Sequence, residues 1–215
     1  MAMRSPTVLS SPAGLHGAVL LDKDGTLLEN VPYNVDPVQM RLAPTAGDAL
    51  RRLARLDMPL VVVSNQPGVA LGRFGMEALH AVHRRLGELF LMHGARLSGF
   101  FYCPHHPAGT VPDYARACSC RKPAPGMLRH AASVLGFDLR QSWMIGDILD
   151  DVEAGNRAGC STILVDCGNE SEWVRDAHRT PDFVEPDLDH AARVVAAGLQ
   201  PTRAPLTQAG MAVPP

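Results

Sequence analysis

Short apolar runs alternate with amphipathic segments along most of the chain. The run GAVLLD at 17–22 contains no polar residue before its final acid, which is typical of a strand buried on both faces of a parallel sheet. The segment 44–57 instead carries an apolar stripe at helical spacing, with its arginines mostly on the opposite face, and predicts an amphipathic helix. The residues expected to face the core are Ala46, Ala49, Leu50, Leu53 and Ala54.

The same alternation continues to residue 166. Further strands are predicted at 59–66, 97–103, 142–147 and 161–166, and further helices at 75–93, 125–135 and 150–158. The helix at 75–93 is expected to bury Leu79, Val82, Leu86, Leu89 and Phe90. Strands alternating with helices predict an α/β fold with a mostly parallel sheet. Ligands of such sheets bind at the carboxyl ends of the strands, so polar residues there are candidates for the site.

The 215 residues suffice for one domain with a sizeable core, which we expect at 17–199. The segments 1–16 and 200–215 lack periodicity and are predicted to be flexible tails. A formal net charge of −2 gives no general attraction to nucleic acid or membranes. No apolar run approaches the ~20 residues of a membrane span, and no secretion signal is recognised at the start. We therefore expect a cytoplasmic monomer that binds neither nucleic acid nor a membrane.

Two acidic residues follow the first predicted strand, in the run LLDKDGT. Asp22 and Asp24 are two positions apart on an extended backbone, so both carboxylates can face one site. Gly25 permits a sharp turn directly after them. Taken alone, this run is read equally well as ordinary loop acids, because Asp and Gly are common in turns.

A second acidic group follows the strand predicted at 142–147. Asp147 ends that strand, and Asp150 and Asp151 begin the next helix, where an acid also simply favours a helix N-terminus. Four or five carboxylates at one sheet edge would raise one another's pKa unless a cation lay among them. A site of carboxylates and water suits Mg²⁺, which commonly acts together with a substrate phosphate.

Donors suited to phosphate binding stand at two other places. Ser64, Asn65 and Gln66 lie at the end of the strand predicted at 59–66; the alternative for the serine is a turn hydroxyl bonded to its own backbone. Arg121 and Lys122 lie in the loop before the helix predicted at 125–135, where cations would neutralise a phosphate. A solvated surface pair is the alternative reading of these two cations.

The order of these motifs is more specific than any one of them. DxDGT after a strand, Ser after a Val-rich strand, Lys before a helix and GDxxxD after a strand resemble the four motifs of the haloacid dehalogenase superfamily of phosphatases. The resemblance covers about residues 17–170 and implies a Rossmann-like three-layer sandwich. No insertion between the motifs is long enough for a separate cap domain, so a capless member is expected.

The resemblance also implies the role of each site residue. Asp22 would be the nucleophile that forms an aspartyl-phosphate, and Asp24 the general acid that later acts as a base. Mg²⁺ would be bound by Asp22, the backbone carbonyl of Asp24 and Asp147, with Asp151 in or near its coordination shell. Ser64 and Lys122 would hold the phosphoryl group of a small phosphorylated metabolite.

A metal site is predicted where three cysteines gather with a histidine: Cys103, His105, Cys118 and Cys120. Soft thiolates plus one imidazole suit tetrahedral Zn²⁺, and four protein ligands leave no position for a reacting water. We therefore expect a structural zinc loop at 103–120, with His106 as a substitute ligand. Because one residue separates Cys120 from Lys122, the zinc is also expected to fix where Arg121 and Lys122 point. Cys160 and Cys167 are interpreted as small buried apolar residues.

With these cysteine motifs, the chain resembles one group of that superfamily, the D-glycero-D-manno-heptose 1,7-bisphosphate phosphatases. The segments that carry this resemblance are VVVSNQPGVALGRF, YCPHHP and CSCRKP. The resemblance implies removal of the 7-phosphate. Leu71 and Ile148 depart from the group, which typically has basic residues at these positions. Either Arg73 or Arg121 compensates for the lost charge, or the substrate carries one phosphate instead of two.

Three other functions are considered. Histidinol-phosphatases share the same order of motifs, so histidinol phosphate is the nearest alternative substrate, together with sugar phosphates other than the heptose bisphosphate. Their metal loop is usually shorter than the one in this chain. A zinc-stabilised binding module without catalysis is an alternative from another class. A polynucleotide-end phosphatase is disfavoured by the net negative charge and by the lack of a basic, aromatic stripe.

Overall fold

The computed structural model describes residues 16–174 and 176–198, and a six-stranded parallel sheet forms its centre. The strands are β1 (Val19–Leu21), β2 (Leu60–Asn65), β3 (Leu97–Cys103), β4 (Trp143–Gly146), β5 (Ser161–Val165) and β6 (Phe183–Glu185). They lie in the order β3-β2-β1-β4-β5-β6, and every neighbouring pair is parallel. All the strands therefore end at the same edge of the sheet, where ligands of such folds bind.

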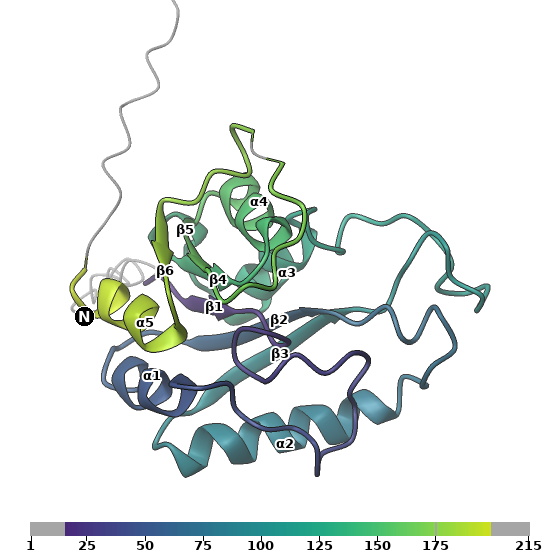
Figure 1. The fold of residues 1–215 in the computed structure, drawn as a ribbon, viewed down its shortest axis with the longest axis horizontal. Helices are drawn as coiled ribbons and strands as arrows, with labels where there is room; N and C mark the ends of the chain where they lie inside the picture. Colours follow the sequence, from purple (N-terminus) through teal and green to yellow (C-terminus); the bar gives the residue numbers. More distant parts are fainter. Residues whose placement is uncertain (1–15, 175, 199–215) are drawn as a thin grey trace, which may run out of the picture.

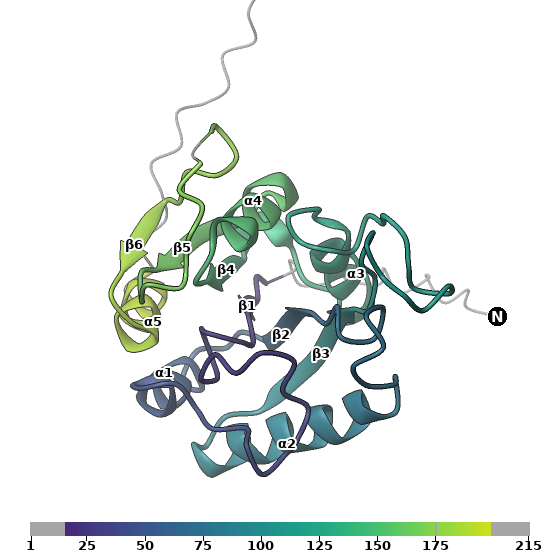
Figure 2. The same ribbon diagram turned by 45° about the vertical axis from the view of Figure 1, so that its right-hand side comes forward.

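Helices cover both faces of this sheet and give the fold three layers (Figure 1). One face is covered by α1, α2 and α5, and the other by α3 and α4, as the turned view also shows (Figure 2). The helices are α1 (Ala46–Leu53), α2 (Ala78–Met92), α3 (Gly126–Leu135), α4 (Leu149–Ala158) and α5 (Leu188–Ala196), with a short 3-10 helix, η1, at Leu139–Gln141.

The alternation along β1 explains why both faces are covered. Val19 and Leu21 pack into the core beneath α1, α2 and α5, whereas Leu20 packs into the core beneath α3 and α4. All three side chains are fully buried. A strand covered on both sides needs apolar residues at every position, which is why this segment reads as a continuous apolar run.

The predicted three-layer α/β fold with a parallel sheet is confirmed, as are the five residues expected to be buried on α2. The prediction that Ala54 faces the core is wrong, because α1 ends at Leu53 and Ala54 is exposed. Cys160 is buried as expected, but Cys167 is exposed in the loop after β5. β6 and α5 were not predicted from the sequence, because a three-residue strand is too short to show a periodicity.

Two long loops reach the functional edge of the sheet. Residues 22–45 connect β1 to α1, and residues 104–125 connect β3 to α3, with turns and isolated bridges but no helix or longer strand. This is consistent with the expected lack of a cap between the motifs. Apart from His16, the expected tails at 1–16 and 200–215 lie outside the described residues. None of the described helices is long and apolar enough to cross a bilayer.

Candidate active site and metal cluster

Two neighbouring strands bring three acidic groups together. β1 and β4 are adjacent and parallel, so Asp22 and Asp147, which directly follow them, lie at the same edge. Asp151 reaches this place from the first turn of α4. One carboxylate oxygen of each residue lies within 4.8 Å of the others, and all three residues are buried. The fold thus unites three of the four predicted magnesium ligands.

Lys122 enters this acidic group from the loop before α3. Its Nζ contacts Asp22 Oδ1, lies 2.6 Å from Asp151 Oδ1 and donates a hydrogen bond of 3.1 Å to the backbone oxygen of Val63. The side chain is only 2% exposed. Burial opposes the charged form of this lysine, but the charges of Asp151 and Asp22 outweigh burial and raise its pKa. The ammonium group is therefore held protonated beside the predicted nucleophile.

Asp24 follows Asp22 by two positions, but its carboxylate has different partners. Lys23 Nζ lies 2.9 Å from Asp24 Oδ1, and Gln66 Nε2 donates a hydrogen bond of 3.3 Å to Oδ2. The Asp24 side chain is 30% exposed, whereas that of Lys23 is 1% exposed. Burial raises the pKa of Asp24, Lys23 opposes this effect and Asp22 adds to it. A carboxyl group with a raised pKa beside a carboxylate suits a residue that must first donate a proton.

Asp147 is held by two side chains that the sequence analysis did not assign. Thr26 Oγ1 donates a hydrogen bond of 2.8 Å to Asp147 Oδ1, and Asn169 Nδ2 donates one of 2.8 Å to Oδ2. Burial, and then the charge of Asp22, raise the pKa of Asp147 to about 6. Thr26 is part of the DGT motif and could have been assigned from it. Asn169 lies in the loop after β5, where no sequence motif indicates a functional residue.

The polar residues at the end of β2 have two different roles. Ser64 is buried, and its Oγ accepts a hydrogen bond of 2.8 Å from Gln66 Nε2. Asn65 instead uses both ends of its amide on the backbone of Lys122, with Nδ2 donating to the carbonyl and Oδ1 accepting from the N–H, each at 3.0 Å. Asn65 thus positions the lysine, which differs from the direct phosphate contact predicted from the sequence.

Arg121 lies immediately before this lysine. Its Nη1 atom is buried and has no hydrogen-bond partner among the described residues. A buried guanidinium nitrogen without a partner is costly, and an anion placed against it would supply the missing acceptor. The other candidate cation, Arg73, lies over the ring of Tyr33, with 5.6 Å from its Cζ to the ring centroid.

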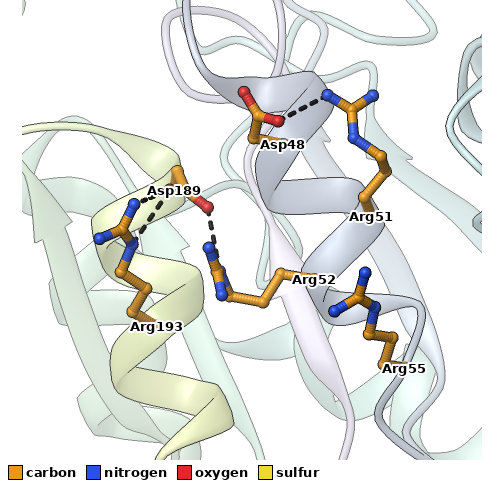
Figure 3. A pocket seen from close by; sticks show the side chains of 6 residues that line it. All are labelled: Asp48, Arg51, Arg52, Arg55, Asp189 and Arg193. Atoms are coloured by element: carbon orange, nitrogen blue, oxygen red, sulfur yellow. Dashed lines mark hydrogen bonds and ion pairs between the residues drawn. The ribbon is translucent and has the colours of Figure 1, made fainter.

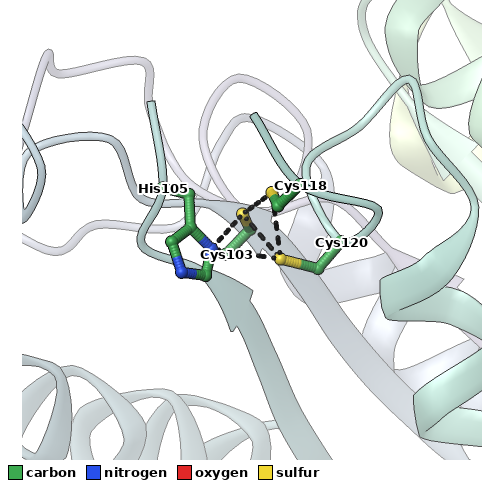
Figure 4. A group of neighbouring side chains, drawn as sticks. All are labelled: Cys103, His105, Cys118 and Cys120. Carbon is green, nitrogen blue, oxygen red and sulfur yellow. Dashed lines mark hydrogen bonds between the residues drawn. The ribbon is translucent and has the colours of Figure 1, made fainter. Parts of the chain in front are cut away.

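The predicted zinc ligands form one compact cluster at the end of β3 (Figure 4). Its three sulfur atoms are 3.0, 3.3 and 3.4 Å apart, and His105 Nδ1 lies 3.4 Å from Cys120 Sγ and 3.6 Å from Cys103 Sγ. Zinc bonds of about 2.3 Å to sulfur imply ligand separations of about 3.8 Å in a tetrahedron, so the sulfur atoms need to move apart by less than about 1 Å to hold zinc. Burial raises the pKa of Cys103, so a cation is needed to hold it as a thiolate.

His106, the substitute ligand considered from the sequence, faces elsewhere. Its Nδ1 accepts a hydrogen bond of 3.2 Å from the backbone N–H of Ala108. The four atoms that could hold a metal belong to Cys103, His105, Cys118 and Cys120, and all lie within 4.8 Å of one another. The geometry therefore favours His105 over His106.

Comparisons with known proteins point to one kind of enzyme. A family described as HAD-hydrolase-like matches residues 119–191. A protein of Escherichia coli (strain K12) named D-glycero-beta-D-manno-heptose-1,7-bisphosphate 7-phosphatase is 35% identical over 166 residues, which are 73% of this chain and 87% of that protein. A protein of the same name from Mesorhizobium japonicum is 40% identical over 142 residues, or 66% of this chain and 65% of that protein.

Solved structures give the same picture. A candidate HAD-like phosphatase from Mesorhizobium loti superposes with a TM-score of 0.75 at 32% identity, covering 89% of this chain and 91% of that one. The D,D-heptose 1,7-bisphosphate phosphatase of B. bronchiseptica, complexed with magnesium and phosphate, has a TM-score of 0.68 at 29% identity and covers 85% of this chain and 99% of that one.

Proposed function

The chain belongs to the family of HAD-like hydrolases that includes the D-glycero-β-D-manno-heptose-1,7-bisphosphate 7-phosphatases, and on this premise we propose that it removes the 7-phosphate of that heptose bisphosphate. One observation carries the proposal. The carboxylate of Asp22 lies beside the buried ammonium of Lys122 and within reach of Asp147 and Asp151, at the edge where open parallel sheets bind ligands.

In the first step, Asp22 acts as the nucleophile. A carboxylate oxygen of Asp22 forms a bond to phosphorus while the bond from phosphorus to the sugar oxygen breaks. Asp24 gives its proton to the leaving oxygen, so this oxygen departs as an uncharged hydroxyl group of the sugar, which keeps its 1-phosphate. The raised pKa of Asp24 suits this role, because the carboxyl group must hold a proton before the reaction.

In the second step, water hydrolyses the aspartyl-phosphate. Asp24, now ionised, takes a proton from the water as its oxygen attacks phosphorus, and the Asp22 carboxylate leaves. Lys122 neutralises part of the phosphoryl charge, and Ser64 and Gln66 supply donors beside it. Asp151 holds the ammonium of Lys122 from the side of α4.

The acidic group fits Mg²⁺. Three carboxylate groups lie within 4.8 Å, and burial together with mutual repulsion raises the pKa of Asp147 and Asp151, so these groups need a cation to ionise together. Asp22, Asp147 and the backbone carbonyl of Asp24 would hold the ion, with Asp151 in or near its coordination shell. When bound, Mg²⁺ neutralises charge on the phosphoryl oxygens.

The sulfur-rich cluster fits Zn²⁺ as a structural ion. Its four ligands would complete a tetrahedral shell and leave no position for a reacting water. Cys120 is separated from Lys122 by Arg121 alone, so the ion would restrain the loop that presents both cations. Zinc is therefore proposed to act on catalysis only through the position of this loop.

The second phosphate of the substrate needs its own cation. Ile148 is half-buried and gives no charge at this edge, and Arg73 is engaged with the Tyr33 ring. Arg121 has a buried nitrogen without a partner in the part of the chain that the structure describes, which makes it the best candidate to bind the 1-phosphate. This assignment keeps recognition of a bisphosphate compatible with the loss of basic residues at positions 71 and 148.

Initial rates of phosphate release, measured with Mg²⁺, test the proposal. The substrate panel contains both anomers of D-glycero-D-manno-heptose 1,7-bisphosphate, histidinol phosphate and simple sugar phosphates. We expect the highest kcat/KM for a heptose bisphosphate. A higher value for histidinol phosphate would reassign the substrate, and no turnover of any ester by folded protein would favour the non-catalytic binding module. Cytoplasmic location and a monomeric state stay predictions from the sequence.

A further inference from the structure

A groove lined only by charged residues lies between α1 and α5, on the flank of the molecule (Figure 3). It has a volume of about 270 Å³. Its lining residues are Asp48, Arg51, Arg52, Arg55, Asp189 and Arg193. None of them belongs to the acidic group or to the cysteine cluster described above.

The groove carries an excess of positive charge. Four guanidinium groups face two carboxylates, which leaves two net positive charges. The whole chain has a formal net charge of −2, so this local excess has the opposite sign to the molecule. A concave cationic surface on an acidic protein attracts anions selectively to that place.

A buried carboxylate orients two of these guanidinium groups. Asp189 Oδ1 accepts a hydrogen bond of 3.0 Å from Arg52 Nε on α1, and Oδ2 accepts bonds of 2.6 and 3.1 Å from Arg193 on α5. Although burial opposes ionisation of Asp189, the two arginines outweigh it and lower the pKa of this carboxyl. Asp189 therefore acts as a fixed anchor, and the side chains of both arginines stay partly exposed toward the groove.

The other two arginines make no hydrogen bond to Asp189. Arg51 pairs with Asp48 at 2.6 Å, and its Nη1 lies 2.6 Å from His93 Nδ1; both side chains of the ion pair are at least half exposed, so this pair is weak. Arg55 follows the end of α1, is exposed and makes no side-chain hydrogen bond or ion pair with any described residue. The guanidinium donors of the groove that these contacts do not use can bind one ligand.

We propose that this groove is a second binding site, and that it takes a compact oxyanion with at least two negative charges, such as a diphosphate or a doubly phosphorylated small molecule. Guanidinium groups bind phosphate oxygens in pairs, and groups held in fixed orientations lose little entropy on binding. The volume suits a small molecule, and the two acids that line the groove disfavour a long polyanion such as nucleic acid.

The site is separate from the reaction centre. α1 begins after the loop at the functional edge and runs back along the sheet, so Arg51 lies about 8 Å along the helix from its first residue, at 1.5 Å per residue, and Arg55 follows the far end of the helix. α5 also begins after the carboxyl end of its preceding strand, and Arg193 lies in its last turn. The proposal therefore does not depend on the substrate of the active site.

Titration of the ¹⁵N-labelled full-length protein with methylenediphosphonate, a diphosphate analogue that phosphatases do not cleave, tests this proposal. The titration is run without added Mg²⁺ and at constant ionic strength. We expect saturable chemical-shift changes in α1 and α5 and in the Arg Nε signals of the groove. Any changes near Asp22 form a second, distinguishable set.

Two variants with the same loss of charge separate specific from general attraction. Arg51→Gln/Arg55→Gln is expected to weaken the affinity measured from the shift changes in the groove at least tenfold. The shift changes near Asp22 are expected to stay the same. The control Arg84→Gln/Arg96→Gln removes two exposed arginines outside the groove and is expected to bind like the natural protein. Shifts confined to the active site, shifts that chloride reproduces, or equal binding by both variants would overturn the proposal, as would binding of an acidic peptide but not of the diphosphonate.

Discussion

The side-chain amide of Asn65 holds the backbone of Lys122 from both sides. Nδ2 donates to the Lys122 carbonyl and Oδ1 accepts from the Lys122 N–H, each at 3.0 Å. Asn65 is the last residue of β2 and pairs in register with Cys103, the first cysteine of the metal cluster. The sheet therefore positions Lys122, the loop that carries it and the cysteine cluster at the same edge.

Replacing Asn65 tests this clamp. Asn65→Ala removes both hydrogen bonds, so the Nζ atom of Lys122 loses its fixed position beside Asp22. We expect kcat/KM to fall about 100-fold, the usual cost of misplacing a catalytic group by about 1 Å. Steady-state kinetics measure the fall, and circular dichroism checks that the variant is folded. A variant that stays fully active would show that the loop holds Lys122 without Asn65.

The nucleophile is tested by Asp22→Asn. The side-chain amide is nearly the same size as the carboxylate, but it is uncharged and too weak a nucleophile to form an acyl phosphate. We therefore expect turnover to fall by about 10⁴-fold or more. Asp150→Asn is the matched control, because Asp150 lies nearby at the start of α4 but pairs with Arg179 at 2.9 Å. The control is expected to keep turnover within about twofold. Full activity of Asp22→Asn would exclude the aspartyl-phosphate route.

The metal cluster is predicted to act on catalysis at a distance. Cys118→Ser weakens zinc binding and frees the loop that leads to Lys122, so kcat/KM should fall while the affinity for Mg²⁺ is kept. His106→Ala is the control, because His106 lies in the same loop but its side chain lies outside the cluster. Zinc content by mass spectrometry and activity are measured on the same samples. A folded, zinc-free sample with unchanged kinetics would refute the coupling.

Gly25 is predicted to be required for the position of Asp147. Its φ of +92° lies in the left-handed region, and a Cβ added there would overlap Asp147 Oδ2 and lie 2.6 Å from Asn169 Nδ2. Gly25→Ala is therefore expected to weaken Mg²⁺ binding at least tenfold, as measured by calorimetry. Gly94→Ala is the control, because Gly94 also has a positive φ, of +69°, but has open space around its Cβ. The control costs about 1–2 kcal/mol of stability and leaves Mg²⁺ binding unchanged.

The acidic group predicts a pH dependence of stability in the metal-free protein. The pKa of Asp147 is raised from 3.8 to about 6 in the folded state, so the folded protein binds more protons than the unfolded chain between these values. The free energy of unfolding should therefore fall as the pH rises from about 4 to 6, by about 3 kcal/mol from this group. Mg²⁺ favours the ionised carboxylate, so its stabilising effect should grow over the same range.

Urea unfolding at several pH values, with and without Mg²⁺, measures this effect. Asp147→Asn removes the titrating group and should flatten the dependence of the metal-free protein on pH. The difference between the natural protein and the variant reports Asp147 together with its effect on Asp151, because the charge of Asp147 raises the pKa of Asp151. An identical slope for both proteins would contradict the raised pKa.

Much of the site could be predicted from local sequence, because its chemistry is carried by short motifs at the ends of strands. Asp22 and Asp147 each follow an apolar run, and parallel strands end at one edge, so their meeting followed from the pattern. The four side chains of the proposed zinc site were equally visible, since three cysteines and a histidine close together in the sequence already suggested a shared metal, and the structure brings their ligand atoms within 4.8 Å of one another. Of the two missing elements, β6 has only three residues, whereas α5 carries an apolar stripe at helical spacing, Leu188, Ala191, Ala192 and Val195, which the sequence analysis overlooked. Their pairing with β5 and α1 depends on contacts distant in sequence.

The sequence by itself indicated which groups are proposed to do the chemistry, because the proposed nucleophile, acid, lysine and metal ligands are all recognised by residue type and motif. Only the tertiary structure decided which side chains form hydrogen bonds to these groups and so fix their positions. Asn169 reaches Asp147 across 22 positions, and Asn65 reaches Lys122 across 57. It also placed arginines of α1 and α5 around Asp189, separated by more than a hundred positions. Such partners depend on how the chain packs, because a polar side chain forms a hydrogen bond with any suitable group that the fold brings within about 3 Å. A local sequence pattern contains no information on which distant group that will be.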